Sequence, residues 1–147
     1  MKKYLIALLL CITPLTHAET DFSNSRSRNL IEGENSQTLI WGQSFGRVFR
    51  GELVIDQQKN DTLIRNTVGL NISAHLFTVG KMNVNVKAGR SSVTEPWLSR
   101  IDNNLGVEIE YRKEMNQSYV VSFMNRIDPV RNYAPDVTVT AGVRFYF

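Results

Sequence analysis

Ser73 and His75 stand two positions apart in the segment NISAHLF and are the residues of this chain best spaced to act as nucleophile and general base. In an extended strand, side chains at positions i and i+2 share one face but stand about 7 Å apart at the backbone. The sequence places no acidic residue where it would orient the imidazole. A histidine that is hydrogen-bonded inside a β-structure is the favoured interpretation, and we assign no catalytic residue.

Metal and cofactor sites are not indicated either. The chain has two histidines and one cysteine, and His17 and Cys11 both lie among the first 18 residues, which leaves scattered carboxylates as ligands. Gly42, Gly46 and Gly51 lie in strand-like sequence and lack the spacing of a phosphate-binding loop. We therefore expect no metal and no cofactor.

The first 18 residues, MKKYLIALLLCITPLTHA, have the three parts of a secretory signal peptide. Lys2 and Lys3 precede an apolar run over residues 5–12, and residues 16–18 form a small-residue cleavage site. A membrane anchor is the alternative, but a spanning helix needs about 20 apolar residues. We expect residues 19–147 to form the mature protein as a single domain.

The mature part is close to electrically neutral. Removing Lys2 and Lys3 from the 17 Lys and Arg leaves 15 cations against 14 Asp and Glu, with no basic patch that would favour nucleic acid. Residues 19–147 contain no cysteine, so a secreted domain of this kind must be held together by a core, a metal or a membrane.

Apolar and polar residues alternate strictly along most of this domain, which predicts β-strands with one apolar face and one polar face. Residues 37–42 give a further strand, whereas Phe22–Leu30 is a poor one, so residues 19–36 are expected to be poorly ordered or a weak first strand. Membrane strands need about 9–11 residues each, and eight of them fit the domain. The fold class predicted is an all-β, antiparallel, up-and-down transmembrane barrel of eight strands. The six clearest segments are SFGRVFRGELVID, TLIRNTVGLNISAHLF, KMNVNVKAGR, LGVEIEYRK, SYVVSFMNRI and VTVTAGVRFYF.

The connections between these strands alternate in length. Residues 57–61, 91–104 and 128–136 are expected to form long loops, whereas 78–80 and 114–117 form short turns. Short periplasmic turns and long extracellular loops are typical of outer-membrane barrels. Trp97 and Tyr133 fall in the long loops and are candidate surface contacts.

Aromatic residues on the apolar faces gather toward one rim, as the aromatic girdle at a membrane interface does. The alternative is that aromatic residues are favoured in any strand. The residues concerned are Phe45, Phe49, Tyr111, Tyr119, Phe145 and Phe147.

The polar faces carry acids and bases that would meet inside a narrow barrel. Buried charges are stable when they are paired, and an eight-stranded barrel is just wide enough to be filled by its own side chains. The alternative is that these charges face bulk water on a soluble sheet. The predicted interior network comprises Arg50, Glu52, Lys87, Glu108, Glu110, Arg112, Arg126 and Arg144.

The chain resembles the small eight-stranded outer-membrane β-barrels, the group that includes the membrane domain of OmpA and OmpX. The resemblance is carried by the signal peptide, by the hairpin rhythm over residues 37–147 and by the apolar series that ends at Val143, Phe145 and Phe147. It implies that outer-membrane lipid surrounds the barrel. It also implies that these last three residues are the assembly signal read by the barrel-assembly machinery.

Together these features predict a non-enzymatic protein of the cell outer membrane. Its role would be structural, in envelope integrity, or a surface interaction through its extracellular loops. The alternative is a soluble periplasmic or secreted β-domain that binds an apolar ligand or an assembly partner.

Overall fold

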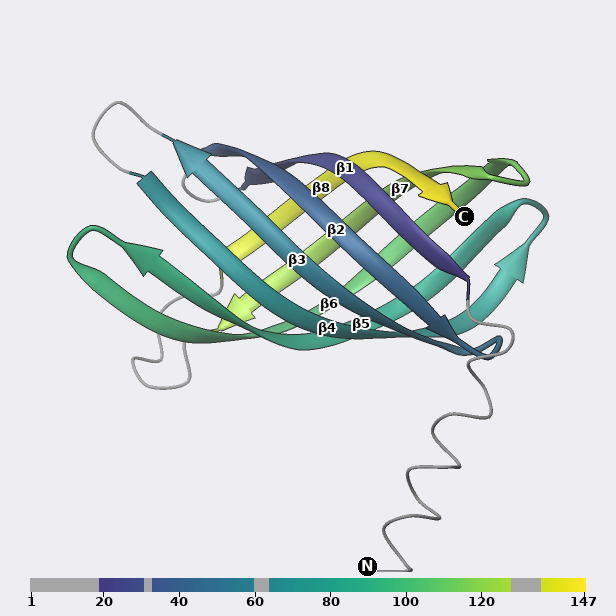
Figure 1. The fold of residues 1–147 in the computed structure, drawn as a ribbon, viewed down its shortest axis with the longest axis horizontal. Helices are drawn as coiled ribbons and strands as arrows, with labels where there is room; N and C mark the ends of the chain where they lie inside the picture. The colour runs from purple at the N-terminus through teal and green to yellow at the C-terminus, as the bar shows by residue number, and fades with distance from the viewer. Residues whose placement is uncertain (1–18, 31–32, 60–63, 128–135) are drawn as a thin grey trace, which may run out of the picture.

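The chain forms a closed antiparallel β-barrel in which each strand pairs with the next and β8 pairs with β1 (Figure 1). The structure, a computed structural model, describes residues 19–30, 33–59, 64–127 and 136–147. The predicted all-β architecture, an antiparallel up-and-down barrel of eight strands, is confirmed. The expected signal peptide lies outside the described residues. The strands are β1 (Thr20–Asn29), β2 (Asn35–Phe45), β3 (Phe49–Lys59), β4 (Ile64–Val79), β5 (Met82–Glu95), β6 (Leu98–Glu114), β7 (Gln117–Ile127) and β8 (Asp136–Tyr146).

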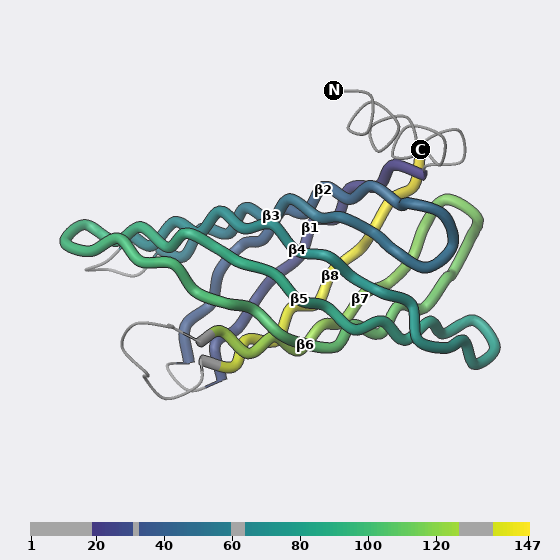
Figure 2. Tube along the Cα trace, turned by 90° about the horizontal axis from the view of Figure 1, so that it is seen from below, coloured from purple at the N-terminus to yellow at the C-terminus, as the bar shows by residue number. Residues whose placement is uncertain are grey.

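The two ends of the barrel differ. One end of the barrel carries Glu19 and Phe147, and we call it the terminal end. These residues lie beside the short turns 46–48, 80–81 and 115–116. At the loop end, β1 connects to β2, β3 to β4, β5 to β6, and β7 to β8. The β4–β5 and β5–β6 hairpins project from opposite ends (Figure 2). In the part of the chain that the structure describes, no helix is long and apolar enough to cross a membrane.

Strand β1 is more regular than its sequence suggested. It pairs without interruption with β2 and with β8, and its alternate side chains from Asp21 to Asn29 are buried. Small polar residues line its inner face, while Asn24, Arg26 and Arg28 join Phe22 on its outer face. Because both faces are largely polar, hydropathy does not alternate along β1, and the pattern that identified the other strands is missing.

Several predicted strand boundaries were wrong, and two of them differ most from the structure. Phe45 and Phe49 were placed on one strand, but Phe45 ends β2 and Phe49 begins β3, and the two are paired across a turn in which Gly46 adopts a φ of 67°. Residues 91–104 were expected to be a long loop, but they continue β5 and β6 as an extended hairpin closed at Pro96 and Trp97. Most of their side chains are polar, with Val93 and Ile101 among the exceptions, so apolar and polar residues do not alternate here as in the other strands.

A β-bulge in β4 changes which side chains enter the barrel. The pairing shifts between His75 and Phe77, so Leu76 is an extra residue. As a result His75 and Thr78 both line the cavity at the terminal end, while Leu76 and Phe77 are exposed.

The apolar side chains lie on the outside of the barrel. Leu70 and Ile72 are 67% and 63% exposed, and Val107 and Ile109 are also exposed. The inward positions are mainly polar, although Ile40, Val54 and Met124 form a buried apolar patch on the inner wall. The residue distribution is therefore the reverse of that in a soluble domain.

Candidate functional site

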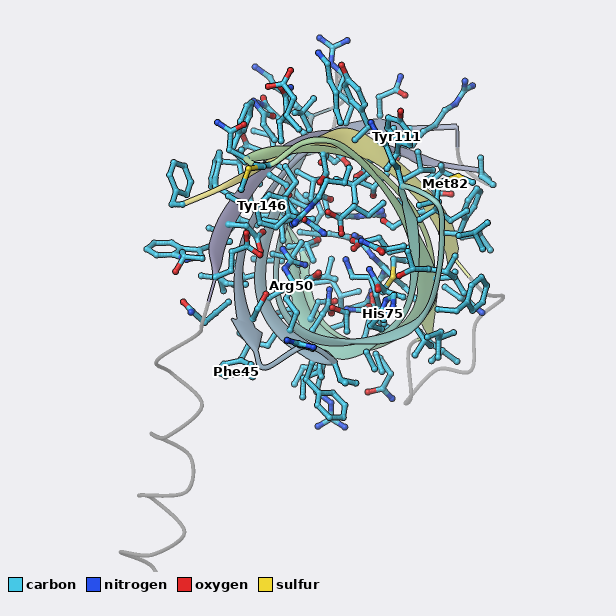
Figure 3. All side chains as sticks on the ribbon, turned by 90° about the vertical axis from the view of Figure 1, so that its right-hand side faces the viewer. Phe45, Arg50, His75, Met82, Tyr111 and Tyr146 are labelled. Carbon is cyan, nitrogen blue, oxygen red and sulfur yellow. The ribbon has the colours of Figure 1, made fainter. Side chains whose placement is uncertain are left out.

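The interior near the terminal end holds a network of buried charges. Figure 3 looks into the barrel from this end, with Arg50, His75 and Tyr146 directed inward and Phe45, Met82 and Tyr111 directed outward. The strands position these charges by alternation, since each stands between two outward-facing residues. The members are Asp21, Arg50, Glu52, Lys87, Glu108, Glu110 and Arg144, all of them buried.

Arg144 and Lys87 join the carboxylates of β3 and β6. The Arg144 guanidinium lies 2.8 Å from a Glu108 carboxylate oxygen and 3.3 Å from one of Glu110. The Lys87 ammonium lies 2.7 Å from Glu52 and 2.8 Å from Glu108. Each charge therefore has an opposite charge within contact distance, which offsets the cost of removing it from water.

Arg50 closes the network against β1. Its Nε and Nη2 donate to the two carboxylate oxygens of Asp21 at 2.7 and 2.5 Å, and its Nη1 donates to Glu52. The guanidinium occupies the space that a Cβ on Gly42 would need. Glycine at that position therefore allows Arg50 to lie flat against β2.

Two predicted members lie elsewhere. Arg112 is at the rim, 3.6 Å from Glu19 and stacked 4.4 Å from the centre of the Tyr146 ring. Arg126 lies toward the loop end, and its ion-pair partner is Asp56 at 3.9 Å. Sequence reasoning missed Asp21, although an acid between outward-facing residues at the start of β1 was a usable signal once β1 was accepted as a strand.

Ser73 and His75 do not form a catalytic pair. The His75 ring nitrogens contact Asn85 Oδ1 at 3.1 Å and Thr78 Oγ1 at 3.0 Å. The Ser73 hydroxyl donates to the backbone carbonyl of Arg50 at 3.5 Å. The histidine is thus held between two neutral side chains in the wall of the cavity.

The interior is filled between its two ends. A polar cavity of about 720 Å³ opens at the terminal end, with Arg50 and Arg144 among its lining residues. Farther in, a cavity of about 30 Å³ lies beside Ile40 and Met124. That volume holds about one or two water molecules. Within the described residues, no cluster of three or more His, Cys, Asp or Glu side chains could hold a metal ion.

The extended β5–β6 hairpin carries a second charged cluster at the loop end. Arg65 Nε lies 2.8 Å from Glu95, and Arg100 Nε lies 3.2 Å from Asp102. The Arg65–Glu95 contact ties the hairpin to β4, and Arg100 Nη1 lies 3.9 Å from Glu95 on the other strand of the hairpin. Trp97, at the tip, is 92% exposed. Tyr133, the other candidate surface contact, lies outside the described residues.

The last residues of the chain close the barrel. Phe145 pairs with Phe22 and Val143 with Asn24, and the backbone NH of Phe147 donates to the carbonyl of Thr20 at 2.9 Å. Phe147 itself is 82% exposed. Strand β8 is thus paired on both sides, with β7 and with β1, and has no exposed edge.

No family model matches the chain, and no curated protein matches its sequence. Solved structures share its architecture. The N-terminal β-barrel domain of Pseudomonas aeruginosa OprF has a TM-score of 0.76 at 15% identity, covering 88% of this chain and 97% of that one. A chain from the de novo design of transmembrane β-barrels has a TM-score of 0.64 at 12% identity, with coverages of 88% and 95%.

The Yersinia pestis outer membrane protein Ail, in a phospholipid bilayer nanodisc, has a TM-score of 0.63 at 9% identity, with coverages of 89% and 100%. At these identities the likeness concerns the fold. It confirms the resemblance predicted from the sequence at that level: the chain has the fold of the small eight-stranded outer-membrane β-barrels.

Proposed function

We propose that this chain is a non-enzymatic integral protein of the outer membrane, with its terminal end in the periplasm and its loop end at the cell surface. The observation that carries the proposal is the reversed polarity of the barrel. Its exposed surface carries large apolar side chains around β3 to β8, whereas the charges of the interior network are buried and paired. In water such a surface would be a severe aggregation liability, whereas in lipid it is the stable arrangement.

The alternative, a soluble barrel that carries an apolar ligand, is less well supported. A carrier of that kind needs an apolar cavity inside. Here the inward side chains toward the terminal end are charged or polar, and the cavity beside the apolar inner patch is only about 30 Å³. A filled interior also argues against a role as an open pore.

Catalysis is not supported by the interior geometry. The best-spaced pair, Ser73 and His75, is engaged with other partners. We assign the interior network a structural role, because it joins β1, β3, β5, β6 and β8.

The element proposed to act at the surface is the β5–β6 hairpin. Two antiparallel strands and the Arg65–Glu95 ion pair hold it, so Trp97 is presented on a stiff support. A large exposed aromatic residue with little freedom is suited to contact a partner at low entropic cost. The partners during biogenesis would be outer-membrane lipid and the barrel-assembly machinery, which would read Val143, Phe145 and Phe147.

The two tryptophans of the chain provide the test. Trp41 lies on the outer face of β2, 61% exposed, and Trp97 lies at the tip of the hairpin. The protein is refolded into vesicles whose acyl chains carry bromine, which quenches tryptophan within the membrane. In W97F the remaining Trp41 should be strongly quenched, while in W41F the remaining Trp97 should be quenched only by aqueous iodide.

A folded barrel should also migrate differently on a gel before and after boiling. If Trp41 in a folded protein is quenched by iodide and not by brominated chains, the membrane proposal is overturned. If both tryptophans are quenched by brominated chains, the proposed placement of the hairpin outside the membrane is wrong.

A further inference from the structure

Charge is divided between the two faces of the barrel wall. Within the strands, the acidic side chains that the structure describes are buried or half-buried, apart from Glu114 beside a turn at the terminal end. The exposed charges on the outer face at or near the loop end are all positive: Arg26, Arg28, Lys59 and Arg90. An outer surface that carries exposed cations and no exposed acids attracts anions.

Three of these cations lie close together. Arg26 and Arg28 are on β1 and Lys59 ends β3, with β2 between them (Figure 1). Arg26 and Lys59 line one outer groove of about 620 Å³ together with amide side chains. We call Arg26, Arg28, Lys59 and the amides of Asn24, Gln37 and Gln57 the cationic notch.

The cationic notch interrupts the apolar outer surface of the barrel. Arg26 is paired with Ala141, and the outward neighbours of Ala141 along β8 are apolar, so the arginine begins among lipid-facing residues. Arg26, Arg28 and Lys59 form no ion pair with any described residue, whereas Arg90 donates to Asn103 at 3.1 Å. A cation at a lipid surface is stable when its side chain reaches the headgroups and finds an anion there.

We propose that the cationic notch binds the phosphorylated headgroups of the lipid leaflet next to the loop end. Guanidinium groups match phosphate oxygens with two parallel hydrogen bonds, and neighbouring amides can donate to the same oxygens. Both chemical types are present in one groove, and no described acid on this face competes for the cations. This inference rests on the proposed insertion into a membrane.

Trp41 reports on lipid near the notch, because it lies outward on β2, four positions along the strand from Gln37. In the W97F background, Trp41 quenching is compared in vesicles of phosphatidylcholine that contain equal fractions of brominated phosphatidic acid or brominated phosphatidylcholine. An anionic surface attracts each nearby cation by a factor of about five. The relative binding constant should therefore favour phosphatidic acid by at least about five-fold, and the preference should shrink as salt is raised.

The variant R26Q/R28Q/K59Q should lose this preference. Its matched control, R47Q/K81Q/K113Q, removes the same charge from exposed residues at or beside the turns of the terminal end and should retain it. Equal quenching by both lipids, retention in the notch variant, or equal loss in both variants would overturn the inference. Absence of quenching by either lipid would instead mean that the barrel is not inserted, which contradicts the proposed function itself.

Discussion

The guanidinium of Arg144 on β8 lies 2.8 Å from the carboxylate of Glu108 on β6, and both side chains are almost completely buried. The two strands are not neighbours, since β7 lies between them. This ion pair therefore spans β7 on the inner side of the barrel wall. It connects the strand that closes the barrel to the wall formed by β6.

Removing one partner of this pair should be strongly destabilising. R144Q leaves Glu108 and Glu110 buried with one cation fewer, which typically costs about 3–5 kcal/mol. The free energy of unfolding in urea, measured in lipid vesicles, should fall by that order, and R144Q/E108Q should recover part of the loss. R112Q is the control, since its side chain is 41% exposed and a surface pair contributes about 0–1 kcal/mol. Equal losses for R144Q and R112Q would contradict the assigned importance of the buried network.

The position of Arg50 should require glycine at position 42. In G42A the new methyl group meets the Arg50 guanidinium, so either Arg50 leaves Asp21 or the strand shifts. Overpacking of this kind costs about 1–3 kcal/mol. The same urea measurement should show a much smaller loss for G51A, whose methyl group faces outward and meets the edge of the Phe45 ring at 3.1 Å. A harmless G42A would show that Arg50 is not held as described.

A charge on the apolar outer surface should lower the free energy of unfolding strongly only if that surface faces lipid. Ile72 and Asn66 both point outward on β4, but Ile72 is paired with Gly51 and Ala88 on the apolar outer surface and Asn66 lies near the loop end. We expect I72R to lower the free energy of unfolding in vesicles by about 2–4 kcal/mol and N66R by about 0–1 kcal/mol. In a soluble sheet an arginine at either exposed position would be tolerated, so equal, small effects would contradict the membrane proposal.

The terminal aromatic residue should matter for assembly in cells. F147D places a carboxylate at the end of the proposed assembly signal, and we expect less heat-modifiable protein in the outer-membrane fraction than for the unaltered chain. W97D is the control, because Trp97 lies at the opposite end, in the turn of the β5–β6 hairpin, and is not paired with another strand. Unaltered insertion of F147D would remove Phe147 from the proposed signal.

The alternation of residue types was readable from the sequence because it is a property of each strand by itself. Leu70, Ile72, Val107 and Ile109 share one face whatever the strand pairs with, and the barrel turns that face outward. The charges between such residues had to enter the interior for the same reason. Six of the eight predicted network residues, including Glu52 and Lys87, lie together there.

Other features depended on pairing between strands, which a single sequence does not specify. Strand β1 carries little apolar periodicity, and it is held by hydrogen bonds to both β2 and β8, so its place became evident only in the closed barrel. The residues taken for a long loop are strand because β5 and β6 remain in register as far as Glu95 and Leu98. Barrel closure brings Arg144 on β8 within 3.5 Å of Asp21 on β1. Strand register places Asp21 beside Arg50 across β2, and it gathers Arg26 and Lys59 outside. Alternation decides which face a side chain takes, whereas strand register and closure decide which side chains meet.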